Sequence, residues 1–219
     1  MTFRIETDYP LAIDSPDHLH PWGTAADNHF NPDFNRRLLK LVNPVAVLDL
    51  GCAGGGMVQS FLKMGQLAVG IDGSNYSLKF KRAAWAKIPG NLFTADIAKP
   101  FTIYDGMAQP YQFDVVTAWE FFEHIKETDL PMVMDNILKH LKPGGLLIGT
   151  TTNAPSRHTK YEYHQTRQPR EWWLKYFSQY GFIDQPALIT HFYNAWVRNG
   201  RFKIAMKLSE AKNGSTENS

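Results

Sequence analysis

Three potential metal-binding side chains lie close together in the segment Trp119–His124, which reads W-E-F-F-E-H. Glu120, Glu123 and His124 are spaced i, i+3 and i+4, so one helical turn would place all three on the same face. Two carboxylates and an imidazole that converge at the end of a strand form a ligand set for a divalent cation. The alternative is that Glu123 and His124 only cap the loop into the next helix. The spacing alone leaves both interpretations open.

A glycine-rich turn indicates a second kind of site. Residues Val47–Gly56 read V-L-D-L-G-C-A-G-G-G, and an acidic residue, Asp72, closes the next apolar run. A strand, a glycine turn, a helix start and a later acid together describe a nucleotide cofactor site. Asp49, two residues before the first glycine, would repel the pyrophosphate of a dinucleotide. S-adenosylmethionine has no phosphate and carries an ammonium and a sulfonium, so it is the predicted cofactor, in preference to NAD.

The cofactor contacts follow from the strand ends. Ligands in open α/β sheets lie beyond the carboxyl ends of the strands. There Asp72 would bind the ribose hydroxyls, Asp96 would accept the adenine amino group, and Ile97 would flank the ring. The predicted cofactor-binding residues are Asp49, Gly51, Cys52, Ala53, Gly55, Asp72, Gly73, Ser74, Asp96, Ile97 and Trp119.

These residues must be positioned by an alternation of strands and helices. Apolar runs predict strands at 46–50, 68–71, 92–93, 113–118 and 146–151, and antiparallel terminal strands within 182–208. Amphipathic spacing, proline starts and glycine ends predict helices from Pro32 to about 42 and at 57–64, 78–86, 131–141 and 171–180. We expect a single domain over 1–210, a disordered tail at 211–219, and a lid and helix within 1–43. The segment His18–His29 is equally consistent with a lid over the cofactor and with a plain surface arm.

The segment Asp49–Gly55 resembles the acidic-x-Gly-x-Gly-x-Gly signature of class I methyltransferases, with Ala53 in place of the middle glycine. The resemblance extends over roughly Leu39 to Thr152, because several motifs occur in the expected order. It implies a Rossmann-like α/β fold: a doubly wound, mostly parallel, seven-stranded sheet with an antiparallel terminal strand. It also implies an enzyme that transfers a methyl group from S-adenosylmethionine.

A long insertion, Ala154–Arg170, follows the fifth predicted strand and contains His158 and His164. Long loops in compact domains tend to be lids or binding loops. Together with Glu-x-x-Glu-His, it resembles the metal-dependent 2′-O-methyltransferases of small-RNA 3′ ends, although Thr152 stands where those enzymes have proline. The resemblance implies that Mg²⁺ or Mn²⁺ is held by Glu120, Glu123, His124 and His164, with His158 as the substitute for His164. It also implies catalytic roles for His124, His164 and Glu120.

A cation would suit transfer to a hydroxyl oxygen, which is a poor acid, since a metal can move the pKa of bound water from ~16 to ~7. Ubiquinone-pathway O-methyltransferases carry a similar Glu-x-x-Glu-His segment, so these ligands do not specify the acceptor. The segments Tyr163–Thr166 and Arg170–Trp173 are similar to parts of methyltransferases of glycan synthesis. The preferred acceptor is therefore a sugar or glycan with a vicinal diol, such as a deoxyhexose. The alternatives are an RNA 3′ end, a small phenolic or quinone-type molecule, and a non-catalytic S-adenosylmethionine-binding module.

The amino-acid composition narrows the choice of binding partners and of cellular compartment. The net charge is +2, far from the basic balance of a dedicated nucleic-acid binder, and Arg157, Lys160, Arg167 and Arg170 are the local basic cluster of the insertion. No run of 18 apolar residues or signal segment is present, and the single cysteine suits a reducing compartment. A cytoplasmic protein that does not enter membranes is expected, with nucleic acid a disfavoured partner. The oligomeric state has no signal in the sequence.

Overall fold

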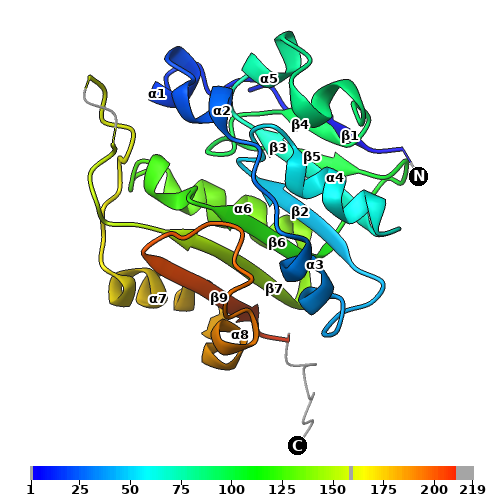
Figure 1. Ribbon diagram of the computed structural model, residues 1–219, viewed down its shortest axis with the longest axis vertical. Coiled ribbons are helices and arrows are strands. Elements are labelled where there is room, and N and C mark those ends of the chain that lie inside the picture. The colour runs from blue at the N-terminus through cyan, green and yellow to red at the C-terminus, as the bar shows by residue number, and fades with distance from the viewer. Residues whose placement is uncertain (1, 158–159, 211–219) are drawn as a thin grey trace, which may run out of the picture.

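The computed structural model describes residues 2–157 and 160–210 and places a seven-stranded sheet between two layers of helices (Figure 1). The strand order is β4-β3-β2-β6-β7-β9-β8. Strands β2, β3, β4, β6 and β7 run parallel, and β9 pairs antiparallel with both β7 and β8. The strands are β2 Ala46–Leu50, β3 Leu67–Asp72, β4 Leu92–Thr94, β6 Phe113–Trp119, β7 Leu141–Thr151, β8 Phe182–Asp184 and β9 Phe202–Leu208. This topology confirms the predicted fold class.

Helices cover both faces of the sheet, and each face has its own apolar core. One core includes Trp173 and Phe177 from α7, and the other includes Phe34 from α3 and Phe61 from α4. The helices are α1 Pro16–Leu19, α2 Trp22–Ala26, α3 Pro32–Leu38, α4 Gly56–Lys63, α5 Tyr76–Lys79, α6 Leu130–His140, α7 Arg170–Ser178 and α8 Pro186–His191, with 3₁₀ turns η1 Ala83–Ala86 and η2 Phe122–His124. No helix among the described residues combines the length and the apolar character that crossing a membrane requires.

The central position of β2 in the sheet explains the continuous apolar run in its sequence. All five residues of β2 are buried, as expected for a parallel strand covered on both faces. Asp49 is the one charged residue of that strand, and it pairs in register with Thr117 of β6. A buried carboxylate is therefore held at the carboxyl end of the sheet, where ligands of this fold bind.

Several predicted elements were wrong in detail. The helix expected at 78–86 is broken, because Lys81 and Ala83 have φ of +48° and +49°, and only α5 and η1 flank the break. Helix α8 occupies residues expected to be strand, and it starts at Pro186, which favours a first helical turn. A small antiparallel sheet of β1 (Arg4–Glu6) and β5 (Thr102–Tyr104) was not predicted. The tail predicted at 211–219 lies outside the described residues.

The N-terminal arm, residues 20–31, contains α2, leads into α3 and passes the carboxyl end of β2 (Figure 1). Its contact with the glycine turn is direct, since the Gly54 N–H donates to the carbonyl of Asp27 at 3.2 Å. The segment proposed as a lid thus lies directly on the turn, and its closing role over a cofactor stays a prediction.

Candidate functional site

The glycine turn after β2 satisfies its own backbone donors. Gly51 and Gly55 have φ of +71° and +75°, and Ala53 has φ of +45°, all in the left-handed region that favours glycine. The N–H groups of residues 51–55 donate to the carbonyls of Ile71, Asp27 and Cys52 and to the Asp72 carboxylate, at 2.7–3.2 Å. A turn built for phosphate presents its N–H groups to the ligand instead. This geometry supports a cofactor without phosphate, as Asp49 predicted.

Two glycines of the run serve the arm rather than a ligand. A Cβ on Gly54 would lie 2.4 Å from Oδ1 of Asn28, and one on Gly56 would lie 2.7 Å from the Asn28 carbonyl oxygen. Both distances are below any normal contact. Small residues are therefore required here so that the arm can approach the turn.

Asp49 is 3% exposed and accepts a 2.7 Å hydrogen bond from the Thr117 hydroxyl. Burial raises the pKa of Asp49 to about 7; the Thr117 bond opposes this, while the charges of Asp27 and Asp72 add to it. A buried carboxylate among other carboxylates is stabilised by a positive ligand. The sulfonium and ammonium of S-adenosylmethionine supply such charges.

Asp72 closes β3 at the turn, as predicted. Its two oxygens accept from the N–H groups of Ala53 and Ser74 at 2.7 and 2.9 Å, and burial raises its pKa to about 6 despite these bonds. Gly73 packs against Ala12, whose Cβ would lie 3.0 Å from a Cβ at that position. The structure thus places Asp72, Gly73 and Ser74 together beside the turn.

The remaining cofactor candidates differ in accessibility. Asp96 lies beyond β4, where its Oδ1 accepts from the Ala98 N–H at 3.0 Å, and burial raises its pKa. Ile97 and Cys52 are 3% and 6% exposed and pack into the two cores. Trp119 packs edge-on against Phe34. Ile97 therefore has little exposed surface, and its contact with the adenine ring stays a prediction.

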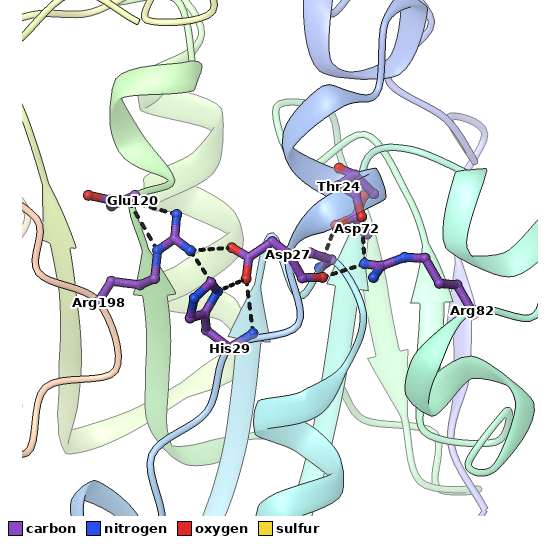
Figure 2. A network of polar contacts seen from close by, with 8 residues as sticks. Thr24, Asp27, His29, Asp72, Arg82, Glu120 and Arg198 are labelled. Carbon is purple, nitrogen blue, oxygen red and sulfur yellow. Dashed lines mark hydrogen bonds and ion pairs between the residues drawn. The ribbon is translucent and has the colours of Figure 1, made fainter. Parts of the chain in front are cut away.

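A network of charged side chains crosses the strand ends in front of the turn (Figure 2). Arg198 donates from Nε and Nη2 to Oε2 of Glu120 at 3.1 and 2.8 Å, and its Nη1 lies 2.9 Å from Oδ2 of Asp27. The imidazole of His29 contacts both Asp27 and Arg198. On the other side of Asp27, Arg82 donates to the carbonyls of Asp27 and Thr24. Neither Arg198 nor Asp27 was predicted, because no motif marks them.

Three of the four predicted metal ligands come together. Glu123, His124 and His164 each offer a ligand atom, and these atoms lie within 4.8 Å of one another. Nδ1 of His124 lies 2.8 Å from Oδ2 of Asp17, and Nδ1 of His164 lies 2.7 Å from the carbonyl oxygen of Ala154. Both acceptors hold a proton on Nδ1, which leaves Nε2 of each ring available, the arrangement common to metal-binding histidines.

Glu123 supplies an unsatisfied oxygen to this cluster. Its side chain is 0% exposed, and Oε2 accepts from the Thr151 hydroxyl at 2.9 Å. Oε1 is buried and has no hydrogen-bond partner among the described residues. Burial raises the pKa of Glu123 to about 7, against the opposing charge of His124. An orphaned carboxylate oxygen beside two imidazoles fits a bound cation.

The charges around the two histidines differ. Burial lowers the pKa of His124, but the hydrogen bond and charge of Asp17 and the charges of Glu123 and Glu120 outweigh it and raise the value to about 9. Burial lowers the pKa of His164, which keeps that ring neutral near pH 7. The surroundings of His124 thus favour positive charge, so a cation bound at Nε2 would take the place of the proton there.

Glu120 is outside this cluster, so the predicted common face of Glu120, Glu123 and His124 was wrong. The physical reason is its backbone, which has φ of +50°, while η2 begins only at Phe122. The chain therefore turns at Glu120 and directs its carboxylate to Arg198. His158, the substitute ligand, lies outside the described residues.

Comparison with known proteins assigns the chain to a protein family. A family model described as a methyltransferase domain matches residues 25–196. The chain belongs to this methyltransferase family. Similar relatives of this methyltransferase include the ubiquinone biosynthesis O-methyltransferases of Idiomarina loihiensis, 29% identical over 63% of this chain and 61% of the relative, and of Nitrobacter winogradskyi, 29% identical over 55% and 44%. The chain spans about half the length of these curated relatives.

Solved structures show the same fold. An amino pentose methyltransferase from Micromonospora echinaspora aligns with a TM-score of 0.56 and 16% identity, covering 81% of this methyltransferase and 89% of that chain. An S-adenosylmethionine-dependent methyltransferase from Clostridium acetobutylicum aligns with a TM-score of 0.58 and 17% identity, covering 87% and 97%. The predicted methyltransferase family and the predicted fold are confirmed.

Proposed function

We propose that this methyltransferase moves a methyl group from S-adenosylmethionine to one oxygen of a vicinal pair of hydroxyls, with the help of a divalent cation. The cation would be held by Glu123, His124 and His164. The observation that supports this most strongly is the buried Oε1 of Glu123, which has no hydrogen-bond partner in the described part of the chain and lies beside two histidines whose Nδ1 atoms are already engaged.

The types of ligand atom also limit which metal would bind. Two imidazoles and one carboxylate suit Mn²⁺ or Zn²⁺ better than Mg²⁺, which prefers oxygen ligands and water. Bound there, the cation would act as a Lewis acid that makes a hydroxyl easier to deprotonate and orients a diol. Asp17, Thr151 and the Ala154 carbonyl would hold the three ligands in place.

The chain's own contribution is alignment. Methyl transfer is an in-line displacement at a carbon already activated by the sulfonium, so holding acceptor oxygen and methyl group in line can supply roughly 7–11 kcal/mol of the barrier. The carboxylates of Asp49 in β2 and Asp27 in the arm would face the charged donor; they lie close enough that the charge of Asp27 helps to raise the pKa of Asp49.

Aromatic side chains next to the histidines support a ring-shaped acceptor. His20 stacks on Tyr161 with ring centroids 3.9 Å apart, and Trp22 lies 6.3 Å from Tyr163. Trp22 is 53% exposed, and the Tyr163 hydroxyl donates to the His20 carbonyl. These rings join the arm to the insertion that carries His164. Among them the exposed ring of Trp22 would pack against a sugar ring, which we take as the first candidate acceptor.

A catechol-type phenol is the second candidate, because two similar relatives are named ubiquinone biosynthesis O-methyltransferases. A catechol presents the same pair of adjacent oxygens to a cation and the same flat ring to the aromatic side chains. Both candidates thus share the metal cluster and differ only in the acceptor ring.

Labelled-methyl transfer tests the proposal with deoxyhexose glycosides, catechols and RNA 3′ ends as acceptors, each with and without chelator. Chelation is expected to abolish transfer and Mn²⁺ or Zn²⁺ to restore it. Glu123→Gln should lose transfer but still bind S-adenosylmethionine, whereas Glu127→Gln, an exposed glutamate four residues on, should behave as the wild type. Full activity of Glu123→Gln and His124→Ala in chelator would refute the metal role. Tight donor binding without turnover on any acceptor would instead identify a binding module.

A further inference from the structure

Arg198 comes from the segment between α8 and β9, which returns to the carboxyl ends of β6 and β7 (Figure 1). Gly200 packs so closely on β7 that a Cβ there would lie 2.5 Å from Cβ of Thr150. Lys203 donates to the carbonyls of Arg198 and Gly200, both at 3.1 Å. The backbone that carries Arg198 is thus held in place at the carboxyl ends of the strands, where the donor is predicted to bind.

The guanidinium of Arg198 does not form the two-oxygen hydrogen-bond pairing that binds a carboxylate most strongly. Nε and Nη2 both donate to one oxygen of Glu120, and Nη1 contacts Asp27 (Figure 2). A guanidinium binds a carboxylate most strongly when two parallel N–H groups reach two oxygens. The observed partners therefore leave a stronger, two-oxygen pairing available to another carboxylate.

The backbone of Glu120 supports a functional reason for this contact. Its φ of +50° places a non-glycine residue in the left-handed region, and such strain persists mainly at functional sites. The strained turn directs the Glu120 carboxylate to Arg198 at the end of β6.

The charges of the network complement the donor. Arg198 carries one positive charge, and Asp27 and Glu120 carry two negative charges, so the group is negative by one. S-adenosylmethionine has a sulfonium, an ammonium and a carboxylate, and is positive by one. The product, S-adenosylhomocysteine, has lost the sulfonium and is neutral. Asp27 is also fixed over the glycine turn through its carbonyl, so the network lies beside the predicted donor site.

We propose that Arg198 binds the carboxylate of the donor's methionine moiety, and that Asp27 and Glu120, released from Arg198, face its ammonium. The C-terminal segment then completes the cofactor site, and the ion pairs seen here are the partners that Arg198 exchanges. This inference goes beyond the proposed function, since it requires neither a metal nor a hydroxyl acceptor.

Calorimetric titration tests it with two ligands and no metal or acceptor. S-adenosylhomocysteine has the amino-acid end, and 5′-methylthioadenosine lacks it. Arg198→Gln is expected to weaken S-adenosylhomocysteine by roughly 10- to 100-fold, the range of a lost charged hydrogen bond, and to change 5′-methylthioadenosine by less than about twofold. Arg198→Lys keeps the positive charge but lacks the paired N–H groups of the guanidinium, so its affinity for S-adenosylhomocysteine should lie between those of the wild type and Arg198→Gln. Arg201→Gln, at an exposed arginine over Phe202, is the matched control.

The pattern across the two ligands decides the outcome. Equal weakening of both ligands by Arg198→Gln would mean that Arg198 only fastens the arm, and would overturn the proposal, as would unchanged binding of both. If Arg198→Gln does not fold, Arg198→Lys carries the same comparison. Because no methyl transfer is measured, failure of the proposed metal-assisted reaction would leave this result unaffected.

Discussion

Replacing Asp49 by asparagine should flatten the dependence of stability on pH. The pKa of Asp49 is about 7 in the folded protein, against 3.8 in an unfolded chain, and burial is the main cause. The unfolded chain therefore loses this proton first as pH rises. The contribution of Asp49 to stability is present below pH 3.8 and is lost as pH approaches 7.

The size of the effect follows from the two pKa values. Between pH 5 and pH 7 each pH unit removes up to about 1.4 kcal/mol, so Asp49 should lower the free energy of unfolding by roughly 2.3 kcal/mol over that interval. The amide that replaces the carboxyl in Asp49→Asn cannot ionise, yet its carbonyl oxygen can still accept the Thr117 hydrogen bond. The variant should therefore lack this loss and be more stable than the wild type at pH 8.

Urea unfolding followed by tryptophan fluorescence at pH 5 and pH 8, without cofactor, measures the difference. Other titrating groups are common to both proteins and cancel in the comparison. Asp135→Asn, at an exposed site on α6, is the control and should keep the wild-type dependence. If Asp49→Asn lost as much stability as the wild type between the two pH values, burial would not be raising this pKa and the reasoning would fail.

Three further predictions concern single contacts. Gly54→Ala should destabilise the fold by about 1–3 kcal/mol through the clash with Asn28, and adding Asn28→Gly should restore most of this in thermal or urea unfolding. Thr151→Val removes the donor to Glu123 and should cost about 1–3 kcal/mol in urea unfolding; an unchanged midpoint would contradict the buried hydrogen bond. His140 is 0% exposed, accepts from the Ile103 N–H, and has a pKa that burial lowers to about 4. Its stabilising contribution is complete above pH 6.5 and falls by up to roughly 3 kcal/mol towards pH 4, a loss that His140→Gln should reduce in acid-unfolding curves.

Much of the fold could be predicted because its signals are local. Continuous apolar runs identified the parallel strands, and proline and glycine marked several helix ends. The prediction failed where a long-range contact decides. Nothing local indicated that the chain would break at Lys81 and Ala83, and the single local signal of Pro186 did not outweigh the strand-like residues around α8.

The residues of the candidate site likewise divide into those that local sequence could locate and those that it could not. Asp49, the glycine turn and Asp72 could be located from sequence, since consecutive residues at two strand ends define them. Glu123 and His124 are adjacent in the chain, so their proximity was assured, but the position of Glu120 depended on a helical turn that its φ of +50° rules out. A spacing argument predicts a shared face only when the backbone between the residues is regular.

The sequence by itself determined the family, and it predicted the methyl donor and two of the three candidate metal ligands that cluster, because each depends on residues a few positions apart. Only the tertiary structure decided which side chains from distant parts of the sequence contact these site residues. Asp17 holds His124 from 107 positions away, and Arg198 reaches Glu120 across 78. Side chains so distant in sequence meet only because the fold brings α1, which carries Asp17, and the C-terminal segment to the carboxyl ends of the parallel strands, and no local pattern encodes that meeting.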